Sequence, residues 1–343
     1  MGQDRWNQLE TLHSFSLTDQ GRRYFDLRRK TPVDPVSLEQ NIVDSWQDNS
    51  VQTKRRQEVA LLGRMDGRIV TSTCREWPIQ IRQPGVIRYL GRFCRRRRLG
   101  IVGTRYPDAY GLDITNRIAC AAAKADIVVV SGGALGIDGH AHRCALDAGG
   151  RTMVVLGSGL MYRSPKSHFR LFDRAIEHGV VMSPFPVDVH PSKWSFPYRN
   201  PWIAACVTDL VVVQAGPRSG ALQTARYALD NGIRVWVVPG AMDNPRHHGC
   251  HLLLKEGAVV LLKHNDWLAD SHGNSIPLEQ KQPMMDLNYW TLFDDKPRSL
   301  EEVCRLSSCS LEKLIAASVR LEANGWLSRR QGAHFVRRYS GRP

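Results

Sequence analysis

The central part of the chain carries seven short runs of apolar, mostly β-branched residues. Between residues 99 and 263 they are LGIVG, DIVVV, TMVVLG, VVMS, DLVVV, VWVV and AVVLL. Within each run the apolar residues are nearly continuous, which is typical of strands buried on both faces of a parallel sheet. Helix-compatible stretches lie between them, at 110–124, 164–179 and 219–232. The pattern predicts an α/β protein whose core, residues 86–270, is an extended Rossmann-like, doubly wound parallel sheet.

The two ends of the chain show other patterns. Residues 1–85 are expected to form a small, mostly helical N-terminal region, and residues 271–287 to form a linker, because they hold proline and polar residues without periodicity. Residues 288–343 predict two helices and then a two-stranded ribbon that turns near Gly332. Ser299 and Glu302 have the spacing of a capping box at the first helix. This order of elements predicts a C-terminal winged helix-turn-helix domain.

Glycines gather where the predicted strands end, most densely in SGGALGIDGHAH, residues 131–142. In an open α/β sheet these ends form one edge, and ligands bind there. A tight strand-to-helix turn explains one glycine at each end more easily than paired ones. We therefore expect this edge to let a backbone approach a ligand closely.

A metal site is not expected in that stretch. Asp138, His140 and His142 are two residues apart, and on a helix the first two point about 200° away from each other. The eight cysteines form no CxxC pair, so buried, reduced thiols are expected rather than zinc ligands or disulfides. Neither GxGxxG at the first turn nor GxxxxGK[ST] is present, so no cofactor is expected. A glycine-rich turn whose N–H groups hold a phosphate remains.

Positive charge is unevenly distributed along the chain. The formal net charge is +14, and residues 51–100 alone contribute +10. The densest cluster is RFCRRRR, residues 92–98, and five arginines lie between residue 329 and the end. Such clusters attract polyanions, although a solvated basic face would have the same composition. No run approaches the ~18 apolar residues of a spanning helix, and no apolar signal region begins the chain, so a cytoplasmic protein without a membrane partner is expected.

Several of these motifs occur together in a known order. IVGTR, SGGALGIDGHAH, VLGSGL, KWSFPYRN, SGALQTA, VPG and GCHLLLKEGA follow one another over roughly residues 77–263. The chain resembles the DprA/Smf family of DNA-processing proteins, and the predicted winged helix matches as well. The resemblance implies a Rossmann-like core that binds and protects single-stranded DNA, homodimerisation, help in loading RecA recombinase during natural transformation, and no catalysis.

The resemblance also implies which residues contact DNA. Arg105 and Lys193 would meet phosphates, Phe196 would stack on a base, and the amides of Gly157 and Ser158 would contact the backbone. We expect KWSFPYRN to be an irregular loop, because Pro197 biases Phe196 towards an extended backbone. The full set of expected contacts is Gly103, Thr104, Arg105, Ser131, Gly132, Gly133, Gly157, Ser158, Gly159, Lys193, Phe196, Arg199, Asn200, Ser219 and Gly220.

This sequence departs from the family pattern at several positions. The family usually has Arg at Leu135 and Pro201, Glu at Gln214 and commonly Asn at His251, and SPFP at 183–186 replaces an SEYP-like stretch. Loss of two arginines near the expected edge should weaken anion binding there. A divergent paralogue with altered duties is therefore an open alternative.

The sequence leaves two other function classes to consider as alternatives. Nucleotide phosphoribohydrolases resemble this core, but their PGGxGTxxE motif needs a carboxylate, and residues 214–228 hold no Asp or Glu. A nucleotide-sensing core coupled to a winged-helix regulatory module is the other. The second helix of that module would carry Glu312, Lys313, Arg320 and Glu322, so it is not strongly basic. The module could therefore bind a protein partner as well as duplex DNA.

Overall fold

The computed structural model describes residues 48–72, 74, 77–79 and 85–271 and, nearer the C-terminus, residues 292–293, 298–307, 310–311, 314–315, 317–318, 327–330 and 334–337. The chain divides into two compact units, Met1–Leu268 and Ala269–Pro343, and each is described by itself. The expected linker lies outside the described residues beyond Ser271.

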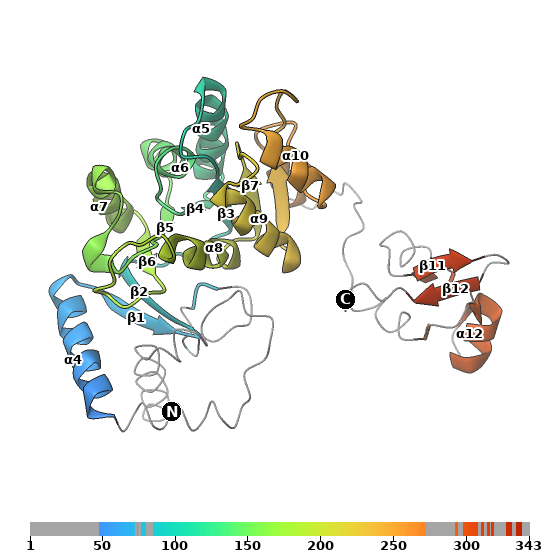
Figure 1. Cartoon of the computed structure of the whole chain (residues 1–343), viewed down its shortest axis with the longest axis horizontal. Helices are drawn as coiled ribbons and strands as arrows, with labels where there is room; N and C mark the ends of the chain where they lie inside the picture. Colours follow the sequence, from blue (N-terminus) through green and yellow to red (C-terminus); the bar gives the residue numbers. More distant parts are fainter. Residues whose placement is uncertain are drawn as a thin grey trace. The chain divides into compact units, whose positions relative to one another are not determined.

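The first unit contains a nine-stranded sheet with the strand order β1-β2-β6-β5-β4-β3-β7-β8-β9 (Figure 1). Strands β3 to β9 all pair in parallel, whereas β1 and β2 are antiparallel to their neighbours. The seven parallel strands coincide with the seven apolar runs, which confirms the predicted sheet. The strands are β1 (Arg68–Thr71), β2 (Val86–Gly91), β3 (Arg98–Val102), β4 (Val128–Ser131), β5 (Thr152–Val155), β6 (Val180–Ser183), β7 (Asp209–Val212), β8 (Arg234–Val237) and β9 (Val259–Val260).

Helices cover both faces of this sheet, as the doubly wound prediction requires (Figure 1). On one face α5 and α6 pack through Ile118 and Ala141, and on the other α8, α9 and α10 pack through Ile203, Ala225 and Cys250. A third cluster joins α4 and α7 to the β2–β6–β5 side. The α-helices are α4 (Asn49–Arg64), α5 (Ala109–Lys124), α6 (Ile137–Asp147), α7 (Phe169–Glu177), α8 (Ser195–Ala205), α9 (Gly220–Asp230) and α10 (His248–Lys255), with short 3-10 turns η1 (Leu160–Tyr162), η2 (Lys166–His168) and η3 (Asp266–Ser271).

The sheet begins earlier in the chain than expected. Residues 68–71, placed in a mostly helical region by the sequence pattern, form β1 and pair with β2. Strand β2 interrupts its apolar run with Arg88, which is completely buried. The Arg88 Nε atom lies 3.0 Å from Oε1 of Glu58, a buried residue of α4. A charged residue in mid-strand is normally exposed, and the ion pair with Glu58 compensates the burial of Arg88.

The second unit has a small core of its own. Strands β10 (Arg298–Ser299), β12 (His334–Arg337) and β11 (Leu327–Arg330) form an antiparallel sheet in that order, and α12 (Leu300–Ser307) follows β10. The predicted ribbon is therefore present, and the Ser299 hydroxyl accepts a hydrogen bond from the Glu302 amide, as the capping box predicted. The second predicted helix lies mostly outside the described residues, so the winged helix remains a prediction.

No helix in the described part of the chain is long and apolar enough to cross a bilayer. The described residues also hold no group of three or more His, Cys, Asp or Glu side chains placed to bind a metal ion.

Candidate functional site

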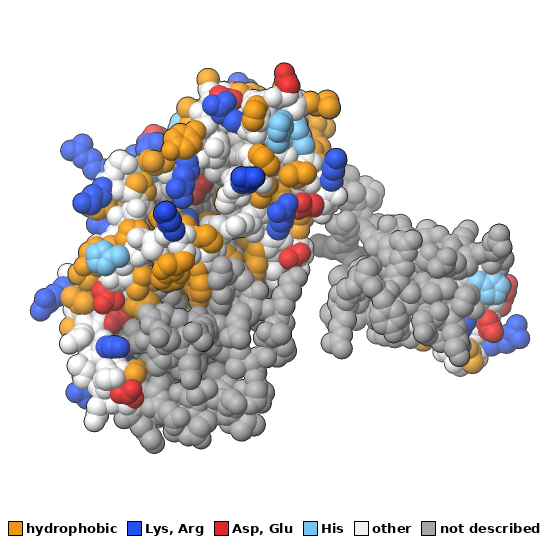
Figure 2. Space-filling view, viewed as in Figure 1, with side chains coloured by type: hydrophobic (Ala, Val, Ile, Leu, Met, Phe, Trp, Pro, Cys, Tyr) orange, Lys and Arg blue, Asp and Glu red, His pale blue; other side chains and the backbone are white. Residues whose placement is uncertain are grey.

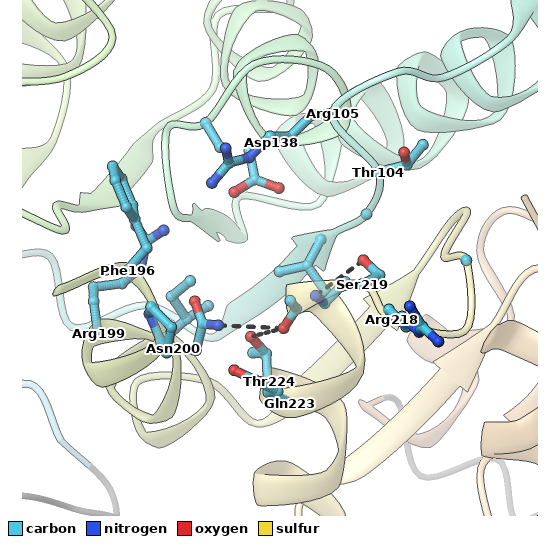
Figure 3. A pocket seen from close by; sticks show the side chains of 18 of the residues that line it. Thr104, Arg105, Asp138, Phe196, Arg199, Asn200, Arg218, Ser219, Gln223 and Thr224 are labelled. Atoms are coloured by element: carbon cyan, nitrogen blue, oxygen red, sulfur yellow. Dashed lines mark hydrogen bonds between the residues drawn. The ribbon is translucent and has the colours of Figure 1, made fainter. Parts of the chain in front are cut away.

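A pocket of about 1020 Å³ opens at the carboxyl ends of β3 and β7 (Figure 3). These strands are neighbours, yet the chain leaves β3 towards β4 on one side and β7 towards β8 on the other. Such a reversal opens a crevice where α/β sheets bind ligands. The walls come from the loop after β3, the start of α6, residues 191–203, the loop after β7 and the first turns of α9.

Three exposed cations stand around this pocket. Arg105 comes from the loop after β3, Lys193 precedes α8, and Arg218 lies in the loop between β7 and α9. Figure 3 places Arg105 and Arg218 on different walls, and Figure 2 shows Lys and Arg side chains around a hollow over β3 and β4. Within the described residues none of the three forms an ion pair. Their charge is therefore available to an anionic ligand.

The Phe196 ring forms part of the wall between these charges. One side of the ring packs on Gly157, where an added Cβ would lie 2.7 Å from the ring atom Cδ1. The guanidinium carbon of Arg105 lies over the ring, 5.4 Å from its centroid, which is within cation–π range. Gly157 thus acts by making room for the ring. In the free protein Arg105 covers a surface that a base would need.

The expectation of an irregular loop at KWSFPYRN is wrong. Residues 195–205 form α8, so Phe196 and Pro197 lie in the first turn of a helix. Proline is tolerated there because the first N–H groups of a helix have no partner within it. The Ser195 hydroxyl donates a 2.5 Å hydrogen bond to the Gly157 carbonyl, which anchors this turn to the end of β5. Contacts distant in sequence thus overrule the local bias from Pro197.

Buried side chains hold the turn that follows β4. The Gly132 amide donates to Oδ2 of Asp138 at 3.1 Å, and the Gly132 carbonyl accepts from Nη1 of Arg199 at 2.6 Å. Nδ1 of His168 donates to the Gly133 carbonyl at 3.0 Å. The amide and carbonyl of Gly132 and the carbonyl of Gly133 are therefore bound by Asp138, Arg199 and His168. The paired glycines form a fixed structural turn beneath the pocket.

Burial changes the electrostatics of this frame. It raises the pKa of Asp138, and the neighbouring Arg199 guanidinium opposes that rise. Burial lowers the pKa of Arg199 to about 10, against the favourable charge of Asp138. Only 3% of Arg199 is exposed, and its Nη1 atom also donates to the Val155 carbonyl. Arg199 is among the residues that line the pocket, but its guanidinium is bound to two backbone carbonyls, so its contact with a ligand stays a prediction.

The remaining expected contacts divide into two groups. Those that line the pocket together with Arg105, Lys193 and Phe196 are Gly103, Thr104, Asn200, Ser219 and Gly220. Those that lie buried behind the wall are Ser131, Gly132, Gly133, Gly157, Ser158 and Gly159. For the two serines the reason is visible, because the Ser131 hydroxyl donates to the Ile101 carbonyl and the Ser158 hydroxyl to the Tyr162 carbonyl. Side-chain contacts from these two serines to a ligand are therefore not part of the site.

Sequence reasoning missed part of the lining. Arg218, Gln223 and Thr224 face the pocket from the loop after β7 and from α9. Thr224 and Asn200 both hydrogen-bond to the Gly220 carbonyl, which ties α8 to α9 across the pocket floor. Gln223 and Thr224 belong to the motif SGALQTA, so their positions three and four residues beyond Gly220 contained the missing signal.

Gln214, one of the departures from the family pattern, supports the loop that carries Arg105. Its Nε2 atom donates to Oδ1 of Asp108 at 2.8 Å and lies 3.1 Å from Nε2 of His247. The backbone carbonyl of Gln214 accepts a hydrogen bond from the Thr104 amide at 2.7 Å. Of the other departures, Leu135 is 44% exposed, Pro201 is buried within α8, and Nε2 of His251 lies 3.1 Å from the Gly240 carbonyl.

The arginine-rich stretch 92–98 lies at the other edge of the sheet. It precedes β3, whereas the pocket follows β3, and neighbouring strands run parallel. Arg96 forms an ion pair with Asp126 at 2.6 Å, and Arg97 forms one with Asp209 at 2.8 Å. This cluster therefore does not replace the arginines that the family pattern has at the pocket.

Comparison with known proteins agrees with this geometry. The sequence profile of the family described as DNA recombination-mediator protein A matches residues 68–272. The chain belongs to this family. It is 32% identical over 301 residues to Protein Smf of Synechocystis, which covers 74% of this chain and 75% of the relative. The resemblance to the DprA/Smf family is thus confirmed.

Solved structures of the DprA family share the fold. DNA processing protein A from Streptococcus pneumoniae superposes with a TM-score of 0.61 at 26% identity, over 76% of this chain and 95% of that one. DNA processing protein A from Helicobacter pylori, whose structure concerns a single-stranded DNA binding mode, gives 0.53 at 24% identity, over 60% and 95%. The second match bears on the fold alone.

Proposed function

We propose that the pocket between β3 and β7 binds single-stranded DNA without sequence preference, as part of a DprA-type role in DNA processing. The observation that carries the proposal is the arrangement of Arg105, Lys193 and Arg218 around Phe196 at the switch point. Cations follow the phosphates, while an aromatic ring accepts the face of any unpaired base. Membership of the DNA recombination-mediator family supports the same assignment.

The chemistry of the lining supports binding rather than catalysis. Among the residues that form the pocket, Asp138 is the one carboxylate, and it is 7% exposed. Its oxygen already accepts from the Gly132 amide, and Arg199 neutralises its charge. A phosphoribohydrolase needs a carboxylate that reaches the glycosidic carbon. We therefore propose no enzymatic activity for this pocket.

Family membership supports a proposal about the wider assembly. We propose that the chain acts as a homodimer in the cytoplasm, protects incoming single strands and helps to load RecA recombinase. The C-terminal unit, with its β10–β12–β11 sheet and α12, is proposed to be the winged helix that contacts DNA or a protein partner. Measurements of the mass in solution and of recombinase assembly on single strands test these points.

One titration tests the pocket assignment. Fluorescence anisotropy with labelled single strands, a duplex of the same length and a labelled mononucleotide is measured over a salt series. We expect single strands to bind most tightly, with affinity that falls as salt rises. Equal or tighter binding of duplex would overturn the proposal and favour the C-terminal unit, whereas preference for the mononucleotide would favour a nucleotide sensor.

A further inference from the structure

In the chain segment between β6 and α8, residues 191–193 lie between two aromatic rings. His190 is stacked on Tyr162, with ring centroids 3.6 Å apart, and Trp194 stands at the start of α8. The residues between them, Pro191, Ser192 and Lys193, line the pocket. Residues 191–193 therefore form part of the rim of the pocket, and ring contacts fix the chain on either side of Lys193.

Trp194 is the most exposed tryptophan among the described residues, with 56% of its surface in solvent. Its ring is nevertheless held, edge-on, by Phe185 at 5.6 Å and by Tyr198 at 6.3 Å between centroids. Phe185 is buried, so the support is rigid. An immobilised aromatic ring loses little conformational entropy when a ligand stacks on it, whereas leaving it in water is unfavourable. Both features are expected of a binding surface.

The surroundings indicate which ligand this surface fits. Lys193, next in the chain, is exposed and forms no ion pair within the described residues. Figure 2 shows hydrophobic side chains gathered at the start of α8, beside the cations that surround the hollow. The acidic residue of the segment 184–194 is Asp188, which lies on the far side of His190 in the chain. A charged group beside an exposed ring matches a phosphate followed by a base.

We propose that Trp194 is a second stacking platform, for a base that lies outside the pocket next to the phosphate bound by Lys193. The inference rests on the proposed single-strand binding and extends the site from the pocket across its rim. Phe196 serves a base within the pocket, and Trp194 serves the following part of the strand. Strands long enough to cross the rim therefore bind more tightly than strands that only fill the pocket.

The test compares a short and a long strand on the same variants. Affinities for dT3 and dT12 are measured for the wild type, Trp194→Ala and Trp194→Phe, with Leu262→Ala as a control for removal of an exposed apolar side chain. Trp194→Ala is expected to weaken dT12 binding about fivefold or more and to leave dT3 binding unchanged. Trp194→Phe retains most of the dT12 affinity, and Leu262→Ala changes neither. Thermal melting verifies that all variants are folded.

The outcomes separate this inference from the proposed function. If wild type binds both strands and Trp194→Ala binds dT12 normally, Trp194 contacts something other than DNA and the inference is overturned. An equal loss for dT3 and dT12 also overturns it, because Trp194 would then act through the pocket. If wild type binds neither strand, the proposed function itself fails. Quenching of tryptophan fluorescence by dT12 that is reduced in Trp194→Phe supports stacking directly.

Discussion

Arg105 and Phe196 are expected to be energetically coupled in DNA binding, with a sign that the structure predicts. In the free protein the Arg105 guanidinium covers the Phe196 ring at 5.4 Å, while Gly157 packs against the ring. A base that stacks there must displace Arg105, which then meets a phosphate. The contact that is lost is worth about 0.5–1 kcal/mol at an exposed site. This competition weakens binding by the wild type.

The size of the coupling follows from how often the Arg105–Phe196 contact is lost in the single and double variants. Arg105→Ala and Phe196→Ala each abolish it, so each single loss of affinity is partly offset. The double variant abolishes it only once. Its binding should therefore be weaker than the two single changes predict, by about two- to fivefold in Kd. The combination of Lys193→Ala with Phe196→Ala should be additive, since no contact joins those two side chains.

Anisotropy titrations of labelled dT12 on the four members of each cycle, at a single salt concentration, measure this coupling. Circular dichroism melting verifies that every member is folded. An additive result for the Arg105 cycle would show that Arg105 does not compete for the ring. A double variant that binds better than additivity predicts would refute the reasoning more directly, because the base would then lie between guanidinium and ring.

Three further predictions concern single positions. Phe196→Ala should weaken binding of single strands about tenfold while Phe196→Tyr preserves it, and a loss of melting temperature without loss of affinity would show a purely packing role. Lys193→Ala and Arg218→Ala should each reduce the slope of log K against log salt by about 0.7. The control Arg117→Ala, at an ion-paired surface position, should not change that slope. Equal slopes for all variants would contradict the placement of the cations. Burial lowers the pKa of His142 to about 3 from 6.5, so the unfolded chain binds this proton first as pH falls. The free energy of unfolding should then drop below pH 6.5 by up to about 1.4 kcal/mol per pH unit. His142→Phe should flatten that pH dependence in denaturant titrations. Parallel curves of unfolding free energy against pH for the wild type and the variant would contradict this prediction.

The parallel sheet was predictable because its strands are buried on both faces. Runs such as VVV at 128–130 and VVV at 211–213 have no polar residue on either face of the strand. Such a run indicates a strand that is buried on both faces, without any information from distant residues. Strand β2 was not predictable in this way. Arg88 interrupts its apolar run, and the partner that makes its burial possible, Glu58, lies thirty residues earlier on α4. Pairing at that distance leaves no local pattern.

The sequence correctly predicted that the candidate site lies at the edge formed by the carboxyl ends of the strands. It predicted only part of the set of residues that line the site. Its glycines indicate where strands end, which is a local property. The pattern does not distinguish Arg199, which is buried and binds the Gly132 carbonyl, from Arg218, which is exposed at the pocket. Both are arginines beside a motif, and their difference in burial arises from the packing of α8 under the turn after β4. The helical start of α8 was missed because Pro197 suggests an extended chain where a Ser195 anchor prevails.

Hydrogen exchange with and without dT12 tests the central claim most directly, because it shows where the strand binds. The account predicts slower exchange in three segments that border the pocket, residues 131–138, 191–200 and 216–224, at salt concentrations where the strand is bound. The arginine-rich stretch 92–98, at the opposite edge of the sheet, should exchange at the same rate in both samples. Protection confined to residues 92–98 or to residues 298–337 of the C-terminal unit would contradict the account.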